Sequence, residues 1–204
     1  MIRQFYFPTV IYEKTLENKD KLNFKLTKDI LEWKIKDPKG LQKSNALGWH
    51  SNTNMHIKEE YKNFVDEIKE ALINIHYQEG YSQKRDMVIV GMWANVSPKY
   101  SYNTFHTHPP NFLSGVYYVQ TPKNCGKIIF QDLGSAKNYG WQSNTEYENP
   151  LQPHQWDTVN YEAEAGKLLI FPSYLGHYVE QNLTDLEGED SLRISISFNV
   201  NWYV

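Results

Sequence analysis

The sequence predicts a mainly β fold, an antiparallel β-sandwich or jelly roll, with two helices packed on one outer face of a sheet. Two amphipathic helical patterns lie before residue 76, and from residue 86 onward eight short strand patterns alternate with turn residues. Aromatic residues make up 15% of the chain, with 15 Tyr, 9 Phe and 6 Trp. That composition is more typical of β-strands and of a pocket lined by aromatic side chains than of a helical bundle.

The length and charge of the chain limit the classes of protein to consider. All-β folds of 204 residues commonly form one unit, so we expect a single domain over residues 1–204, with a helical buttress at about 15–79 and a β core at about 86–203. A formal net charge of −3 is too small to indicate nucleic acid or a membrane as a partner. The single cysteine and an N-terminus without the apolar core of a signal peptide predict a cytoplasmic protein.

The elements are predicted in order along the chain. Residues 4–14 are predicted as an edge strand, because a proline interrupts them and cannot donate to a ladder. Apolar residues at every third or fourth position predict helices over 22–33 and 57–75, and the Gly-, Pro-, Ser- and Asn-rich residues 36–54 between them are predicted as a loop. Residues 137–153 form the longest irregular stretch and are a candidate lid. The eight later strands are expected over residues 86–96, 101–106, 113–121, 126–133, 155–163, 167–173, 177–182 and 192–202.

The last of these strands has the clearest two-residue alternation. Its polar side chains fall on one face and its apolar side chains on the other: Arg193, Ser195, Ser197 and Asn199 against Ile194, Ile196, Phe198 and Val200. If the apolar face packs under the helices, the polar face points into the sandwich. Burying a charged arginine there is unfavourable in free energy unless an anion pairs with it. The pattern therefore predicts an internal carboxylate or phosphate near Arg193.

The segment FHTHPP, residues 105–110, places His106 and His108 two positions apart at the end of a predicted strand. With this spacing both imidazoles leave the same face of the strand and can converge on one metal ion. His177 is the best candidate for a third ligand, because it begins a strand after the turn FPSYLG. Three protein ligands on one side of a metal suit a non-haem Fe(II) centre, although a single histidine is more often a surface or hydrogen-bonded residue.

An ordered set of motifs carries a family resemblance. The runs HTHPPNFLSGVYYVQTP, GKIIFQD, GKLLIFPSYLGHYVEQN and LRISISFN resemble the 2-oxoglutarate/Fe(II)-dependent oxygenases of the prolyl-hydroxylase-like superfamily, in particular a bacterial and phage branch. The resemblance covers residues 86–202 closely and the N-terminal helices loosely. It implies a double-stranded β-helix, a cupin-like jelly roll, with the two N-terminal helices packed on one sheet.

The resemblance also implies roles for individual residues. His106 would be the first metal ligand and His177 the distal ligand. Arg193 would pair with the distal carboxylate of 2-oxoglutarate, and Ser195, two residues further along the same face, would share that carboxylate.

The sequence departs from the family pattern at His108, where a carboxylate ligand is expected. Either the centre has three histidines, or His108 lies outside it and a carboxylate such as Asp132 or Glu180 completes the set. We favour the three histidines, because the loss of an anionic ligand changes the affinity and redox tuning of the metal without abolishing the facial geometry.

Tyr117 and Tyr118 are adjacent on one predicted strand, so only one of them can face inward. We assign Tyr117 as a hydrogen-bonding partner of the co-substrate, and core packing is the alternative.

The resemblance implies an enzyme that uses Fe(II), O2 and 2-oxoglutarate, hydroxylates an unidentified small-molecule or peptidyl substrate, and releases succinate and CO2. One alternative is a jelly-roll metal-binding module without turnover, although structural zinc sites usually close with four ligands. Another is a three-histidine cupin-like dioxygenase that does not use 2-oxoglutarate. The sequence determines neither the substrate nor the oligomeric state, and a homodimer is compatible with it.

Overall fold

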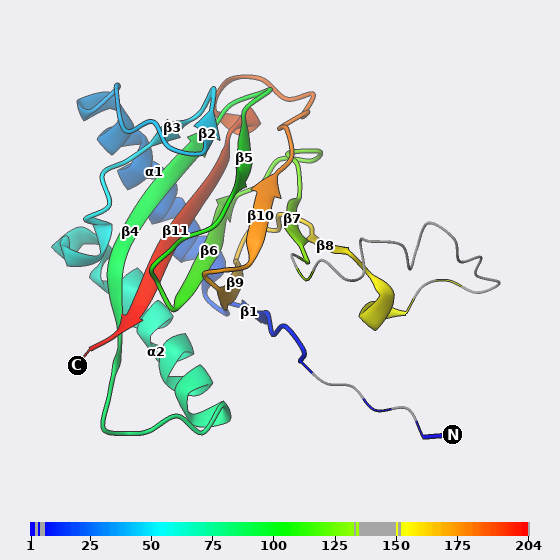
Figure 1. The fold of residues 1–204 in the computed structure, drawn as a ribbon. Helices are drawn as coiled ribbons and strands as arrows, with labels where there is room; N and C mark the ends of the chain where they lie inside the picture. Colours follow the sequence, from blue (N-terminus) through cyan, green and yellow to red (C-terminus); the bar gives the residue numbers. More distant parts are fainter. Residues whose placement is uncertain (3, 5–6, 133, 135–149, 151, 204) are drawn as a thin grey trace.

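The structure of the protein is a computed structural model, and it describes residues 1–2, 4, 7–132, 134, 150 and 152–203. Two antiparallel sheets pack face to face, and two helices cover the outer face of the larger sheet (Figure 1). The candidate lid over residues 137–153 lies outside the described residues, apart from residues 150, 152 and 153.

The larger sheet has six strands in the order β1-β9-β6-β11-β4-β3. These strands are β1 (Tyr12–Thr15), β3 (Trp49–His50), β4 (Met87–Ser97), β6 (Leu113–Gln120), β9 (Lys167–Pro172) and β11 (Arg193–Trp202). Strand β11 lies between β6 and β4 and is antiparallel to both. Strand β1 pairs only with β9 among the described strands, so it is an edge strand as the sequence predicted. It begins at Tyr12, however, so Pro8 and most of the predicted range 4–14 lie outside it.

The smaller sheet has five strands in the order β2-β5-β10-β7-β8. They are β2 (Asn45–Ala46), β5 (Tyr102–His106), β7 (Ile128–Gln131), β8 (Thr158–Tyr161) and β10 (Gly176–Val179). Strands β2 and β3 both lie within residues 36–54, where the sequence predicted only a loop. Each is two residues long, too short to show a periodic pattern.

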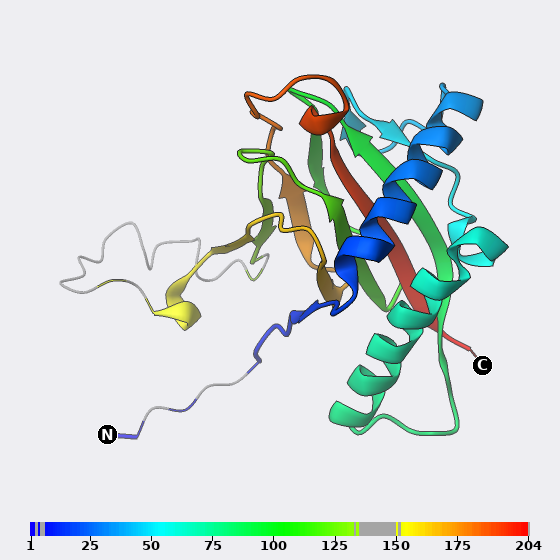
Figure 2. The same ribbon diagram turned by 180° about the vertical axis from the view of Figure 1, so that it is seen from behind.

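Helices α1 (Lys19–Lys36) and α2 (Lys62–Gln78) lie across the outer face of the larger sheet (Figure 2). Short 3-10 helices complete the elements: η1 (Met55–Ile57), η2 (Glu59–Tyr61), η3 (Pro153–Gln155) and η4 (Gly188–Ser191). No helix among the described residues is both long enough and apolar enough to span a membrane.

The main hydrophobic core lies between the helices and the larger sheet. The apolar face of β11 is fully buried there, as the alternation predicted, with Ile194, Ile196, Phe198 and Val200 packed among Leu26, Ile30, Phe64, Ile68 and Leu72 of the helices. Each side chain of this size contributes about 1.5–3 kcal/mol when it leaves water. This burial determines which face of β11 points outward to the helices, so the polar face must point inward between the two sheets.

A second, smaller core lies between the sheets. It contains Val116, Tyr118, Ile128, Phe130, Leu169, Phe171 and Leu175. These side chains pack between the two sheets, and four of them, Val116, Tyr118, Ile128 and Phe171, also line a cavity there.

Candidate metal centre

The two sheets enclose a cavity of about 560 Å³, which is within the size range of small-molecule sites. The polar face of β11 lines it, with Arg193 at one end of the strand and Asn199 further along. The smaller sheet contributes His106 from β5 and His177 from β10. The inward direction predicted for the polar face of the last strand is therefore confirmed.

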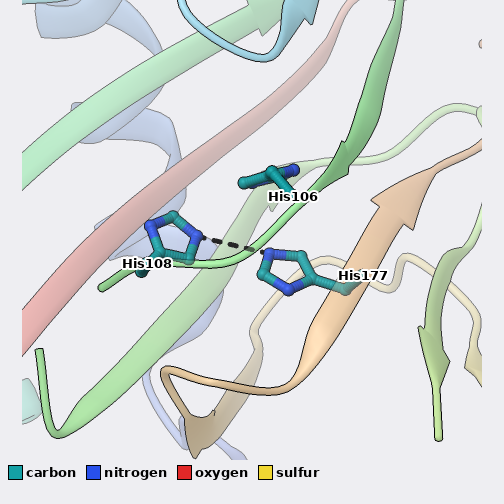
Figure 3. Close-up of side chains that lie close together, drawn as sticks. All are labelled: His106, His108 and His177. Carbon is teal, nitrogen blue, oxygen red and sulfur yellow. Dashed lines mark hydrogen bonds between the residues drawn. The ribbon is translucent and has the colours of Figure 1, made fainter. Parts of the chain in front are cut away.

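The structure brings His106, His108 and His177 together at this cavity (Figure 3). His106 and His177 are register partners on β5 and β10. His108 follows the end of β5, where its backbone N–H donates to the carbonyl of Ser173 at 2.9 Å. One nitrogen from each of the three rings lies within 4.8 Å of the other two.

The distances fit a shared metal ion. The Nε2 atoms of His108 and His177 are 3.3 Å apart. Two imidazole nitrogens bound at right angles to one metal at 2.0–2.1 Å would lie about 3 Å apart. The two rings therefore need only a small shift to become ligands of one ion.

Backbone carbonyls determine which ring nitrogen of His106 and His177 carries the proton. The Nδ1 atom of His177 lies 2.9 Å from the carbonyl oxygen of Leu175, and that of His106 lies 2.7 Å from the carbonyl oxygen of Thr104. Because a carbonyl only accepts, Nδ1 must be the donor in both rings. Each Nε2 is left with its lone pair, the arrangement that metal-binding histidines use.

Burial keeps the three rings neutral. It lowers the pKa of His177 to about 3 and the pKa of His108 to about 4, and it also lowers the pKa of His106. The neutral imidazole is the form that binds a metal.

No carboxylate joins the three histidines among the residues that the structure describes. Asp132 follows β7, where its Oδ1 accepts the backbone N–H of Gly134. The carboxylate of Glu180 accepts the backbone N–H of Lys127, and Glu180 is exposed. Neither residue lines the cavity.

Arg193 lies at the other end of the cavity and is only 2% exposed. Its Nη1 donates to the carbonyls of Cys125 and of Glu180, whereas its Nη2 is buried without a hydrogen-bond partner. Burial lowers the pKa of the Arg193 guanidinium, but an arginine remains charged at neutral pH. A buried cation with an unused donor calls for an anionic ligand.

Tyr118 stands beside Arg193, and its hydroxyl is also buried without a partner. It is the register partner of Ser195 on β11, and both residues line the cavity. Burial raises the pKa of the Tyr118 hydroxyl, which therefore keeps its proton and can donate it to a ligand. Arg193, Ser195 and Tyr118 together fit the far carboxylate of 2-oxoglutarate.

Tyr117, which the sequence analysis assigned to the co-substrate, lies on the opposite face of β6. Its hydroxyl donates to Asn23 of α1 at 2.7 Å, and its ring packs 5.0 Å from that of Phe64. The alternation correctly allowed only one inward tyrosine. Ser195 pairs with Tyr118 and Ile196 pairs with Tyr117, so the register between β6 and β11 decides which tyrosine faces inward. This pairing shifts between Ile194 and Ser195, and the sequence carries no sign of that shift.

Several residues that line the rest of the cavity carry no signal in the sequence. Among them are Lys43, Ser44, Trp93, Asn95 and Asn111. Asn and Ser are common in loops and on strand faces, so only their position around the histidines distinguishes them.

Comparisons with known proteins identify a family for this chain. Residues 91–199, more than half of the chain, match the model of a family described as "Putative 2OG-Fe(II) oxygenase". A comparison with curated proteins finds no match.

Several solved structures share the fold. A Pseudomonas putida prolyl-4-hydroxylase is 11% identical, with a TM-score of 0.64 over 95% of this chain and 92% of that one. A Trichoplax adhaerens prolyl hydroxylase, solved with a peptide fragment of hypoxia inducible factor, is 11% identical, with a TM-score of 0.61 over 94% and 83% of the two chains.

HygX from Streptomyces hygroscopicus, solved with nickel, 2-oxoglutarate and hygromycin B, is 9% identical, with a TM-score of 0.60 over 95% and 83% of the two chains. At these identities the likeness concerns the fold, which is the double-stranded β-helix that the sequence resemblance implied. Together with the family match, it shows that this chain belongs to the 2OG-Fe(II) oxygenase family.

Proposed function

We propose that the protein is a 2-oxoglutarate-dependent dioxygenase with a three-histidine Fe(II) centre. In the overall reaction a substrate C–H bond, O2 and 2-oxoglutarate become a C–OH group, succinate and CO2. One oxygen atom enters the product and the other enters succinate. The observation that carries the proposal is one cavity with three metal-binding nitrogens and, at its Arg193 end, two unpaired buried donors.

The histidines would hold Fe(II) through Nε2 of His106, His108 and His177. The hydrogen bonds from Nδ1 to backbone carbonyls orient the first and last of these rings before the metal binds. When bound, the iron and 2-oxoglutarate supply the oxidising chemistry, which no side chain of the protein can perform alone.

Arg193 would fix the direction of the co-substrate. Its free Nη2, with the hydroxyls of Ser195 and Tyr118, would donate to the far carboxylate of 2-oxoglutarate in charge-assisted hydrogen bonds. The keto-acid end would then point along β11 toward the histidines.

The apolar side chains around the cavity would limit the access of water to the histidines and to the bound co-substrate. Rings of Phe130 and Phe171 lie 5.7 and 4.9 Å from the ring of His177, and Val116 and Ile128 line the same cavity. A low local dielectric strengthens the contact between Arg193 and a carboxylate.

The buried Arg193 argues against the two alternatives. Metal binding without turnover does not explain why the cavity has a buried cation at its other end. A cupin-like dioxygenase that works without 2-oxoglutarate would leave the Nη2 of Arg193 unpaired, at a cost of about 1–3 kcal/mol or more for a charged group.

The proposal is tested by anaerobic titration of the protein with Fe(II) and 2-oxoglutarate. We expect the visible charge-transfer band of the chelate in the wild type. In Arg193→Ala we expect the band to need far more 2-oxoglutarate, while Fe(II) binds as before. Circular dichroism controls for folding of the variant. The absence of the band in the wild type would contradict the proposal, and so would an unchanged 2-oxoglutarate requirement in the variant.

A further inference from the structure

The cavity contains a second polar region that the co-substrate does not explain. Trp93 and Asn95 of β4 are the register partners of Ser197 and Ser195 on β11, and all four residues line the cavity. The ring of Trp93 lies 6.0 Å from that of His108. This region therefore adjoins the histidines on the β4 side, away from β6 and Tyr118.

Asn95 presents an unused hydrogen-bond acceptor in this region. The residue is only 7% exposed, and its Nδ2 donates to Ser197 Oγ at 3.2 Å. Its Oδ1 is buried with no hydrogen-bond partner among the described residues. Leaving such an acceptor unpaired destabilises the unbound site, so a ligand that donates to it gains affinity. A carboxylate of 2-oxoglutarate cannot do this, because it has only acceptor oxygens.

His50 provides a second acceptor beside the first. It is the register partner of Asn95 on β3, it is 4% exposed, and it lines the cavity. Its Nδ1 lies 2.6 Å from the carbonyl oxygen of Ser51 and must be the donor, which leaves the lone pair on Nε2. Burial lowers the pKa of His50, and the nearby Lys43 lowers it further, so the ring stays neutral.

Trp93 adds a flat apolar surface. Its indole stacks on the ring of His50 with centroids 5.3 Å apart and an angle of 11° between the planes. Both rings are more than nine-tenths buried, so the stack is held in one orientation.

The charge around this region disfavours cations. None of the described residues that line the cavity is acidic, whereas Lys43 and Arg193 both line it. A divalent metal held by three neutral histidines would add further positive charge. A cationic ligand would meet repulsion without any carboxylate to offset it.

We propose that the substrate presents a neutral hydrogen-bond donor, an amide N–H or an O–H group, to Asn95 Oδ1 and His50 Nε2, with an adjacent flat face on Trp93. Asn95 and His50 are then residues that determine specificity, and the substrate class is neutral and polar, not cationic. The inference rests on the proposed function, because it takes the Arg193 end of the cavity as the co-substrate site.

The test uses three small probes that share a phenyl ring and differ in the group attached to it. Benzamide carries neutral N–H donors, N,N-dimethylbenzamide carries none, and benzylamine is a cation at neutral pH. Isothermal titration calorimetry measures their binding to anaerobic protein loaded with Fe(II) and 2-oxoglutarate, in which no turnover occurs. We expect benzamide to bind about tenfold more tightly than either of the others.

Substitutions of Asn95 and His50 test whether these two residues cause the preference for benzamide. In Asn95→Leu the preference for benzamide should disappear, and in Asn95→Asp it should reverse in favour of benzylamine, because a carboxylate then faces the ligand. His50→Phe keeps a ring on Trp93 but removes the acceptor, so it should weaken benzamide binding selectively. Asn160→Leu, on the exposed side of β8, is the matched control and should bind all three probes as the wild type does.

The outcomes separate this inference from the proposed function. Equal binding of the three probes, no binding of benzamide, or tightest binding of benzylamine to the wild type would overturn the inference. A tenfold loss of 2-oxoglutarate affinity in Asn95→Leu would overturn it too, by assigning Asn95 to the co-substrate. Absence of the chelate band in the wild type would instead refute the proposed function.

Discussion

The Nε2 atoms of His108 and His177 lie 3.3 Å apart, although 69 positions separate the two residues in the chain. His108 thus occupies the place where the family resemblance implies a carboxylate. With no acidic residue beside these rings in the described part of the chain, the composition of the candidate metal centre depends on His108.

Replacement of His108 tests its role directly. We expect His108→Ala to weaken Fe(II) binding by more than about tenfold, because two imidazoles alone leave the facial set incomplete. His108→Asp should bind Fe(II) more tightly than His108→Ala, since a carboxylate oxygen can occupy the same position. Anaerobic Fe(II) titration measures both, with His56→Ala, at a histidine that does not line the cavity, as the control. Wild-type affinity in His108→Ala would exclude His108 as a ligand.

The adjacent residues Tyr117 and Tyr118 provide a matched pair of variants, because each can lose its hydroxyl by substitution with Phe. Tyr118→Phe removes a hydroxyl beside Arg193, so we expect the dissociation constant for 2-oxoglutarate to rise about three- to tenfold. Tyr117→Phe instead removes the hydrogen bond to Asn23 and should cost about 1 kcal/mol of stability without affecting 2-oxoglutarate. Titration of the chelate band and urea denaturation distinguish the two effects. The opposite pattern would mean that Tyr117 is the residue that contacts the co-substrate.

Gly126 is predicted to position Arg193. A Cβ at Gly126 would lie 2.9 Å from Arg193 Nη1 and 2.5 Å from the carbonyl oxygen of Glu180, which accepts a hydrogen bond from that same Nη1. Gly126→Ala should therefore displace the guanidinium and weaken 2-oxoglutarate binding several-fold, while Fe(II) affinity is retained.

Gly80→Ala is the control for backbone strain at Gly126. Gly80 also has a positive φ, +67° against +90° at Gly126, but a Cβ there meets no atom within 4 Å. Both variants should lose some stability. Equal 2-oxoglutarate affinity in the two would contradict a positioning role for Gly126.

Gly115 is predicted to be essential for packing under the helices. It is the register partner of Phe198, and a Cβ at Gly115 would overlap the phenyl ring. Gly115→Ala should destabilise the protein by about 1–3 kcal/mol through overpacking. Gly91→Ala on β4, where the nearest atom to a Cβ is 3.8 Å away, should cost much less. Comparable urea midpoints for the two variants would show that Phe198 can move aside.

Much of the site follows from the period of a strand. Because successive side chains alternate between faces, the apolar residues of the last strand predicted that Arg193 points inward. The HxH spacing predicted a shared direction for His106 and His108, although β5 ends at His106 and His108 follows the strand. The motif order then indicated His177. These conclusions need only local geometry and the burial of apolar surface, and both can be read from the chain.

What the sequence by itself determined is the class of fold and the inward direction of Arg193, and it made His106, His108 and His177 the favoured candidate ligands, because local periodicity and chemistry carry that information. Only the tertiary structure decided that Tyr118 faces the cavity in place of Tyr117, that His50 of the two-residue strand β3 lies beside Asn95, and that neither Asp132 nor Glu180 reaches the histidines. These features depend on the register between strands far apart in the chain. A shift of one residue reverses the direction of every side chain in a strand, and nothing in the local sequence reports it.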